Sequence, residues 1–320
     1  MFTGCGTALV TPFRKDLSLD EATLRKLVRR QIGQGINFLV PCGTTGENPT
    51  MTRAEHLRVV EITLEEAKGK TPVLAGCGGY NTSEVIELGK ELRAMGADGL
   101  LSVTPYYNKP TQEGLYQHFK AVAGAVDLPI VVYSVQPRTS VNVEPATLQR
   151  LAAIDNIVGV KEASGSMDQT TEIIERLGRK FTILSGDDSL TLPLMAIGAV
   201  GVISVVANLL PKHVARLCRF MWEEKIHQAQ DIHQQLFPIT KALFVETNPA
   251  PIKAAMAEVG LINDETLRLP LVTIKKDTRT GSITVSADES TKKTSITLTV
   301  GTDTSNSSAS PAESSNDGSM

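Results

Sequence analysis

The sequence is poor in aromatic residues, histidine and cysteine, and these shortages limit what it can do. Aromatic residues make up 4% of the 320 residues, and only one of them is a tryptophan. The five histidines show no HxH or HExxH spacing, and the four cysteines stand far apart with no CxxC pair. The sequence therefore predicts neither a metal site nor a disulfide framework, and we expect reduced thiols.

The chain also lacks an excess of charge and long apolar runs. Its net charge of −3 includes no excess of positive charge that would attract nucleic acid or an anionic membrane. No run approaches the roughly 18 apolar residues of a membrane span. The opening MFTGCGTALVTPF has no basic stretch before its apolar segment, so no signal peptide is predicted. These absences favour a cytoplasmic globular protein.

What the chain does contain is a repeated alternation of short apolar runs and amphipathic segments. Several runs are almost unbroken, as expected of strands that are covered on both faces. Helical patterns lie between them, and the first has Asp20 near its start and Gly35 at its end as cap signals. The predicted strands span residues 6–10, 37–41, 71–76, 98–103, 128–135, 156–161, 181–186 and 200–205.

Eight such alternations in about 205 residues predict a (β/α)8 TIM barrel. An open doubly wound sheet is the alternative, but no GxGxxG motif follows the first strand. We predict a barrel over residues 1–210, a small C-terminal helical region over 211–276 and a Ser/Thr-rich tail over 277–320. In the tail, SITV and SITLTV could pair as a hairpin, and the last twenty residues are predicted to be disordered.

Polar residues follow the predicted strands at their carboxyl ends, where barrels of this class build active sites. CGTTGE after the second strand offers two glycines and the hydroxyls of Thr44 and Thr45, which suit a small carboxylate or form a local turn. Tyr133 and Arg138 accompany the fifth strand. A phenol exchanges protons and a guanidinium binds a carboxylate, although a core tyrosine and a surface arginine are the alternatives.

The seventh strand is followed by SGDDS. Gly186 allows close approach of the backbone. Asp187 or Asp188 is predicted to cap the next helix rather than bind a metal.

Lys161 ends the apolar run of the sixth strand, in NIVGVKEASGS. A buried amine is costly unless it is paired or loses its proton, and a neutral amine is a nucleophile. Lys161 is therefore either an ion-pair partner, with Glu162 as the nearest carboxylate, or a group that forms a Schiff base with a ketone.

The motifs GTTGE, TPYYN, VVY…RT, GVKEASG and LSGDD resemble, in order and spacing, the dihydrodipicolinate synthase family of pyruvate-dependent class I aldolases and lyases. The resemblance runs from about residue 1 to 273. It implies a lyase that condenses pyruvate with L-aspartate-4-semialdehyde to 4-hydroxy-tetrahydrodipicolinate, in lysine and diaminopimelate biosynthesis. It also implies that no metal or organic cofactor is needed.

The resemblance assigns catalytic roles. Lys161 would form the Schiff base with pyruvate, and Tyr133, Thr45 or Thr44, and Tyr107 would relay protons. In family members, the residue at the position of Tyr107 reaches across a dimer interface and serves the other subunit. The resemblance therefore implies a homo-oligomer, usually a tetramer built as a dimer of dimers.

The resemblance also assigns binding roles. Thr44, Thr45 and the backbones of Gly186 and Ile203 would surround pyruvate, and Arg138 would hold the carboxylate of the semialdehyde. Relatives that bind lysine as a feedback effector do so at positions that align with His56, Glu84, Tyr106, Asn48 and Tyr80.

The chain departs from the family pattern around Arg138. Ser134 stands where the family usually has asparagine, and Pro137 directly precedes the arginine, where it fixes φ and removes a backbone donor. The direction in which the Arg138 side chain points is expected to change. Two alternatives therefore remain: a related pyruvate aldolase or dehydratase that acts on a sugar acid or hydroxyproline derivative, and a catalytically silent barrel that senses a keto acid.

Overall fold

Eight parallel strands form the centre of the molecule. The computed structural model describes residues 2–279, 283–288 and 293–298. The strands hydrogen-bond in the order β2-β1-β8-β7-β6-β5-β4-β3, and a parallel bridge between Leu39 and Val73 joins β2 to β3. The predicted (β/α)8 barrel is thus confirmed, and the open sheet is ruled out. The strands are β1 Gly4–Ala8, β2 Phe38–Val40, β3 Leu74–Gly76, β4 Gly99–Val103, β5 Ile130–Ser134, β6 Ile157–Glu162, β7 Thr182–Ser185 and β8 Gly201–Ser204.

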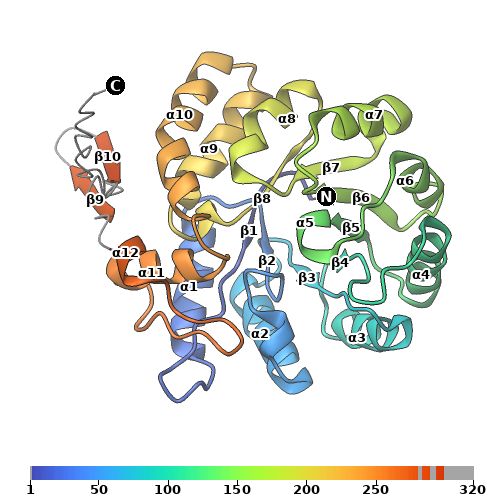
Figure 1. Cartoon of the computed structure of the whole chain (residues 1–320), viewed down its shortest axis with the longest axis horizontal. Helices are drawn as coiled ribbons and strands as arrows, with labels where there is room; N and C mark the ends of the chain where they lie inside the picture. The colour runs from blue at the N-terminus through green and yellow to red at the C-terminus, as the bar shows by residue number, and fades with distance from the viewer. Residues whose placement is uncertain (1, 280–282, 289–292, 299–320) are drawn as a thin grey trace, which may run out of the picture. The chain divides into compact units, whose positions relative to one another are not determined.

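Helices surround the strands (Figure 1). The first of them begins as predicted, because the Asp20 carboxylate accepts the backbone N–H of Thr23 at 3.1 Å. The helices of the barrel are α1 Glu21–Gly33, α2 Arg53–Ala67, α3 Thr82–Ala94, α4 Gln112–Ala125, α5 Gln136–Thr139, α6 Pro145–Leu151, α7 Met167–Leu177 and α8 Thr191–Ile197. Short 3-10 turns are η1 Asn48–Thr50, η2 Gly178–Lys180, η3 Asp188–Leu190 and η4 Val206–Asn208.

The barrel interior is packed with side chains from alternate positions of the strands. Val40, Leu101, Val131, Tyr133 and Ile203 belong to this buried cluster. The intervening side chains pack under the helices, so both faces of each strand are buried. This double burial explains the nearly unbroken apolar runs of the sequence.

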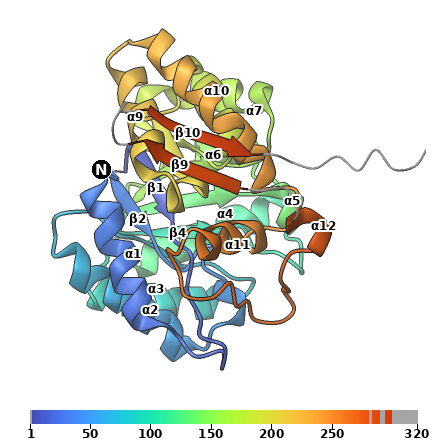
Figure 2. The same ribbon diagram turned by 90° about the vertical axis from the view of Figure 1, so that its left-hand side faces the viewer.

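Three further helices follow the last strand, as the pattern over 211–260 predicts: α9 Pro211–Trp222, α10 Ile226–Ala242 and α11 Ala250–Glu258. Helices α9 and α10 lie side by side (Figures 1 and 2). They belong to one compact unit with the barrel, Met1–Ile274. No helix in the described ranges is long and apolar enough to cross a membrane.

The second unit, Lys275–Met320, contains helix α12 Lys276–Arg279 and an antiparallel pair of strands. The strands are β9 Ile283–Asp288 and β10 Lys293–Leu298, which contain ITV of the first Ser/Thr-rich run and SITL of the second. The disorder predicted for the last twenty residues lies outside the described residues.

A fully buried lysine attaches helix α11 to the barrel. The Nζ atom of Lys253 lies 2.6 Å from Oε1 of Glu47, and neither side chain is exposed to solvent. Lys253 also donates to the backbone carbonyls of Thr11 at 3.0 Å and of Thr266 at 2.6 Å. Its ammonium group lies 4.5 Å from the ring centre of Phe13. All the donor capacity of the amine is used, so the buried charge is compensated.

Replacing Lys253 should destabilise the fold strongly, because Glu47 would remain buried without its counter-charge. We expect Lys253→Ala to lower the free energy of unfolding by about 3–5 kcal/mol, measured by urea denaturation. The matched control is the double variant Lys253→Met with Glu47→Leu, which removes both charges and keeps most of the volume. A double variant as unstable as the single one would show that the charge left unpaired is not the cause.

Candidate active site

A cavity of about 220 Å³ opens at the carboxyl ends of strands β2 to β5. Thr44, Asn48, Tyr106, Tyr133 and Arg138 lie in its wall, so five of the residues singled out in the sequence meet at one place. The rest of the wall is formed mainly by small and apolar residues: Cys42, Gly43, Pro49, Gly76, Cys77, Gly78, Leu101, Val103, Val135 and Thr139. A largely apolar pocket with a few polar groups is typical of a small-molecule site.

Lys161 lies next to this cavity, in the barrel interior. Strand register places it directly beside Tyr133, and its Nζ atom is 4.2 Å from the centre of the Tyr133 ring. The side chain is only 6% exposed. In the part of the chain that the structure describes, no carboxylate lies within ion-pair distance of this amine. A buried, unpaired amine beside a phenol can act as a nucleophile that exchanges protons with its neighbour.

Glu162 does not pair with Lys161. Neighbouring residues of a strand point to opposite faces, and Glu162 faces outward from the barrel. Its carboxylate accepts the backbone N–H of Ser164 at 2.6 Å and the Nε2 group of Gln169 at 3.0 Å. Burial raises the pKa of Glu162, and these hydrogen bonds oppose the increase. Lys161 therefore forms no ion pair with Glu162, its nearest carboxylate in the sequence.

The two threonines after β2 have different surroundings. Thr44 lines the cavity, whereas Thr45 is 3% exposed and accepts a hydrogen bond from Nδ2 of Asn248 at 3.0 Å. The backbone carbonyl of Asn248 in turn accepts from the guanidinium of Arg138 at 3.2 Å. Asn248 thus connects two loops of the site, and the Oδ1 atom of its side chain is buried without a partner. No local signal in the sequence points to this residue.

Pro137 is accommodated without disturbing the backbone of Arg138. It lies in the first turn of helix α5, where a missing N–H leaves no helical hydrogen bond unmade. The N–H of Arg138 donates to the Val135 carbonyl at 2.9 Å, and the side chain remains at the cavity wall. Ser134, the other departure, is buried and its hydroxyl donates to Asn142 Oδ1 at 3.2 Å.

Gly186 and Ile203 lie beyond the residues that line the cavity. The N–H of Gly186 donates to the Glu162 carbonyl at 2.7 Å, and an added Cβ would stand 2.5 Å from Cβ of Ala163. Only glycine fits this close approach between β6 and the end of β7. Ile203 is 1% exposed and packs in the same interior cluster as Tyr133.

Asp187 and Asp188 have separate roles. Asp187 caps the short η3 turn by accepting the N–H of Ser189 at 2.8 Å, as the sequence predicts. Asp188 instead reaches across to β8. Its carboxylate accepts from the hydroxyl of Ser204 and from the backbone N–H groups of Val205, at 2.9 Å, and Val206, at 3.2 Å.

The contacts of Asp188 matter because β7 and β8 are weakly paired. Their register contains a single residue pair, Ser185 with Val202. The carboxylate therefore joins the ends of two strands, one leading to Gly186 and the other containing Ile203. Sequence reasoning missed this role, because the partner groups follow in the next strand and turn.

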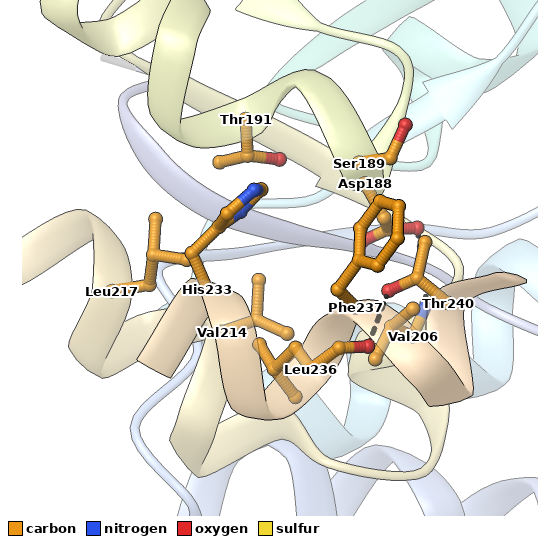
Figure 3. A pocket seen from close by; sticks show the side chains of 10 residues that line it. All are labelled: Asp188, Ser189, Thr191, Val206, Val214, Leu217, His233, Leu236, Phe237 and Thr240. Atoms are coloured by element: carbon orange, nitrogen blue, oxygen red, sulfur yellow. Dashed lines mark hydrogen bonds between the residues drawn. The ribbon is translucent and has the colours of Figure 1, made fainter. Parts of the chain in front are cut away.

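Helix α10 covers Asp188 from outside the barrel. In Figure 3, Phe237 and Thr240 lie close to Asp188, beside a cavity of only about 10 Å³. A space of this size holds at most one water molecule. Burial raises the pKa of Asp188 from its ordinary 3.8 to about 6, although three donors favour the charged form.

Tyr107 does not reach the cavity of its own chain. It is 87% exposed, with φ at +62°, and its ring centre lies 6.4 Å from that of Tyr80. Tyr80 in turn packs edge-to-face on Tyr106 at 5.3 Å. The three rings form an exposed aromatic group near the cavity mouth, because Tyr106 also lines the cavity.

The residues aligned with the lysine-effector positions are only partly together. Tyr80 packs against Tyr106, and burial raises the pKa of Tyr106, with smaller contributions from Tyr80 and Glu84. Asn48 lines the cavity. His56 is 4% exposed, its Nε2 atom lies 3.0 Å from the Gly76 carbonyl, and burial lowers its pKa to about 4.

All four cysteines are buried and unpaired. Within the described ranges, no group of three or more His, Cys, Asp or Glu side chains is arranged to hold a metal ion. The polar groups of the site are thus an amine, hydroxyls, a guanidinium and amides.

Comparison with known proteins agrees with this geometry. The sequence profile of the Dihydrodipicolinate synthetase family matches residues 1–286. A 4-hydroxy-tetrahydrodipicolinate synthase of Pelobacter propionicus is 52% identical over 271 residues, which cover 85% of this chain and 93% of that protein.

Solved structures agree as well. The crystal structure of dihydrodipicolinate synthase from Aquifex aeolicus has a TM-score of 0.85 and 45% identity, over 87% of this chain and 94% of that one. A structure described as the first monomeric dihydrodipicolinate synthase variant has the same TM-score with 46% identity, over 87% and 93% of the two chains. With a barrel of this topology and a profile match along most of its length, the chain belongs to the dihydrodipicolinate synthase family.

Proposed function

We propose that this chain is a Schiff-base lyase that condenses pyruvate with L-aspartate-4-semialdehyde to give 4-hydroxy-tetrahydrodipicolinate. Family membership supports the reaction, and relatives at about 50% identity carry the name of that synthase. The observation that carries the mechanism is the buried amine of Lys161, which lies beside Tyr133 and has no carboxylate partner among the described residues.

Lys161 starts the reaction by adding to the ketone carbon of pyruvate. Loss of water from the adduct gives the Schiff base, and loss of a methyl proton gives an enamine. The enamine carbon attacks the aldehyde carbon of the semialdehyde, which forms the new C–C bond. Attack of the substrate's own amine on the Schiff-base carbon then closes the ring and releases Lys161. No metal or organic cofactor is needed, because the protonated Schiff base serves as the electron sink.

Tyr133 is the proton carrier closest to the amine. Its ring lies against Nζ of Lys161, and its side chain borders the cavity where the substrate would sit. Thr44 shares this wall, so we assign the next step of the relay to Thr44 and a supporting role to Thr45, whose hydroxyl accepts from Asn248. Pyruvate would be held by these threonines and by the backbones of Gly186 and Ile203.

Arg138 would bind the carboxylate of the semialdehyde. A guanidinium at the cavity wall suits a planar carboxylate, and its bond to the Asn248 carbonyl fixes its direction. This group favours the aspartate-derived aldehyde over the sugar acids or hydroxyproline derivatives of related aldolases.

We propose a homo-oligomer in which Tyr107 serves the site of a second copy. The exposed tyrosine lies in an aromatic group that is suited to a subunit interface. A tetramer built as a dimer of dimers, in the cytoplasm, fits this proposal. The monomeric variant among the structural relatives shows that the oligomer is not a property of every such protein.

The first test is trapping with borohydride. Incubation with pyruvate and borohydride should leave a reduced pyruvyl adduct on Lys161, located by peptide mass spectrometry, because reduction makes the Schiff base permanent. Lys161→Ala should give no adduct and no turnover while keeping the circular dichroism of the parent. Lys161→Arg is the control that keeps the charge without the nucleophile, and it should also be inactive.

An aldehyde panel on the same preparation separates the alternatives. Consumption of L-aspartate-4-semialdehyde supports the synthase. An adduct on Lys161 without that consumption, but with turnover of a sugar-acid or hydroxyproline derivative, would assign a related aldolase. An adduct without any turnover would indicate a silent keto-acid binder, and the absence of an adduct on the folded protein would refute the mechanism.

Asp188 should affect the affinity for pyruvate rather than the chemical step. In Asp188→Ala the ends of β7 and β8 lose three hydrogen bonds, so Gly186 and Ile203 should no longer hold pyruvate in place. We expect the KM for pyruvate to rise about tenfold, equivalent to ~1.4 kcal/mol, with little change in kcat. Asp187→Ala, which removes only the η3 cap, is the matched control.

The pH dependence of stability gives a second readout for Asp188. Its pKa is higher in the folded chain, at about 6, than its ordinary 3.8, so the folded state binds the proton more tightly. This contribution to stability is complete below pH 3.8 and is lost as the pH rises through 6. Asp188→Asn should remove that decrease; an unchanged curve, together with an unchanged KM for pyruvate in Asp188→Ala, would contradict the assigned role.

We also propose that lysine binds weakly beside Tyr80, Glu84 and Tyr106, with its ammonium group on the Glu84 carboxylate and with Asn48 nearby. His56 is too buried to take part unless it moves. Millimolar lysine should then slow the reaction, and Glu84→Gln should relieve the effect. A rate that is constant up to that concentration in the parent would eliminate this effector site.

A further inference from the structure

A second hollow, of about 510 Å³, lies at the end of the barrel opposite Lys161. It is formed by the connection between α1 and β2 and by the outer face of α9. Gly4 and Asn37, at the amino ends of β1 and β2, mark this end of the barrel. The side chains that line it are Gln34, Asn37, Lys212, Arg216, Arg219 and Trp222.

The lining of the hollow offers hydrogen-bond donors and no acidic side chain. Ammonium, guanidinium and indole N–H groups only donate. The Oδ1 atom of Asn37 already accepts the backbone N–H of Cys5 at 2.9 Å, which leaves the amide NH₂ of Asn37 as its free group. Apart from the amide oxygen of Gln34, the polar side-chain groups that remain free here are donors, so a ligand that uses them must supply acceptors.

The positive charge of the hollow is poorly neutralised. Among the described residues, neither Lys212 nor Arg216 has a carboxylate within ion-pair distance. Arg219 lies 3.6 Å from Glu223, and that carboxylate is also held by Lys225 at 2.7 Å. The charges of Arg216 and Lys212 help to lower the pKa of nearby His213, although burial is the larger cause. An ordinary solvated helix face carries interspersed acids, whereas α9 contains no acidic residue before its C-cap Glu223.

Trp222 gives the hollow a flat apolar wall. Its side chain is 46% exposed, so part of the ring is accessible from the hollow. The ring is also held in place. A Cβ on Gly4 would lie 2.6 Å from Cη2 of Trp222 and 2.4 Å from Oδ1 of Asn37, so the two side chains meet over a residue that must be glycine. The site is therefore preorganised.

We propose that this hollow binds a nucleoside diphosphate or triphosphate, with its phosphates on Lys212, Arg216 and Arg219 and its base against Trp222. Guanidinium groups match phosphate oxygens in bidentate geometry, and the tryptophan face suits stacking of a planar ring. The volume is within the range of small-molecule sites. The proposal concerns a site remote from Lys161 and is independent of the lyase reaction.

Trp222 is the only tryptophan of the chain, so its emission reports on this hollow alone. ADP should quench it saturably with a dissociation constant of about 0.1–1 mM, and added salt should weaken the binding. Inorganic pyrophosphate should compete with ADP at higher concentration, and adenosine should bind far more weakly. Arg216→Ala should weaken ADP binding about tenfold or more through loss of the bidentate contact. Arg179→Ala removes an exposed charge elsewhere and should leave ADP binding unchanged.

Both variants should keep the lyase rate of the parent, which verifies that they are folded. Emission that does not respond to ADP or pyrophosphate would overturn the proposal. So would ADP binding of equal affinity in the parent and in Arg216→Ala. Adenosine that binds as tightly as ADP would refute the phosphate contacts, and pyrophosphate that binds as tightly as ADP would refute stacking on Trp222.

Discussion

The buried ion pair between Lys253 and Glu47 is the interaction on which the site depends. Glu47 ends the loop that contains Thr44 and Thr45, and Lys253 lies in helix α11, after the segment that contains Asn248. The pair is fully buried and leaves no donor of the amine unused, so it holds the two segments together. Asn248 thereby reaches Thr45 across 203 positions of sequence. The C-terminal helices are thus part of the site and not an appendage of the barrel.

The barrel supplies the second constraint, because parallel strands end on one face. Register between β5 and β6 sets Tyr133 beside Lys161 without any hydrogen bond between the two side chains. Fixing the position of these two side chains requires a closed barrel. However, β7 and β8 share only one registered residue pair. The carboxylate of Asp188 strengthens this junction from outside, under helix α10 (Figure 3). At this junction the Asp188 side chain joins neighbouring strands, as backbone hydrogen bonds do elsewhere in the barrel.

The sequence predicts the barrel well and singles out Lys161 as a candidate, for physical reasons. Apolar runs report burial on both faces, and Lys161 stands out because a charge ends such a run. Orientation is harder to predict. Nothing in GTTGE says that Thr44 faces the cavity while Thr45 faces Asn248, and nothing in SGDDS says that Asp188 turns to β8. These facts depend on partners that are distant along the chain, and local patterns do not contain them. From the sequence, Pro137 is expected to disturb the backbone before Arg138. In the structure it occupies the first turn of helix α5, a position that tolerates proline.

The two buried lysines show how surroundings decide the chemistry of one side chain. Lys253 has a carboxylate and two carbonyls around its amine, which consume all three donors and keep its charge in place. Lys161 is 6% exposed, and its nearest acidic neighbour points away to Ser164 and Gln169. A paired amine is held in place by its counter-charge, whereas an amine without one is not held in this way. The pairing of Lys253 therefore holds the site together, whereas the amine of Lys161 lies beside Tyr133 without a counter-charge.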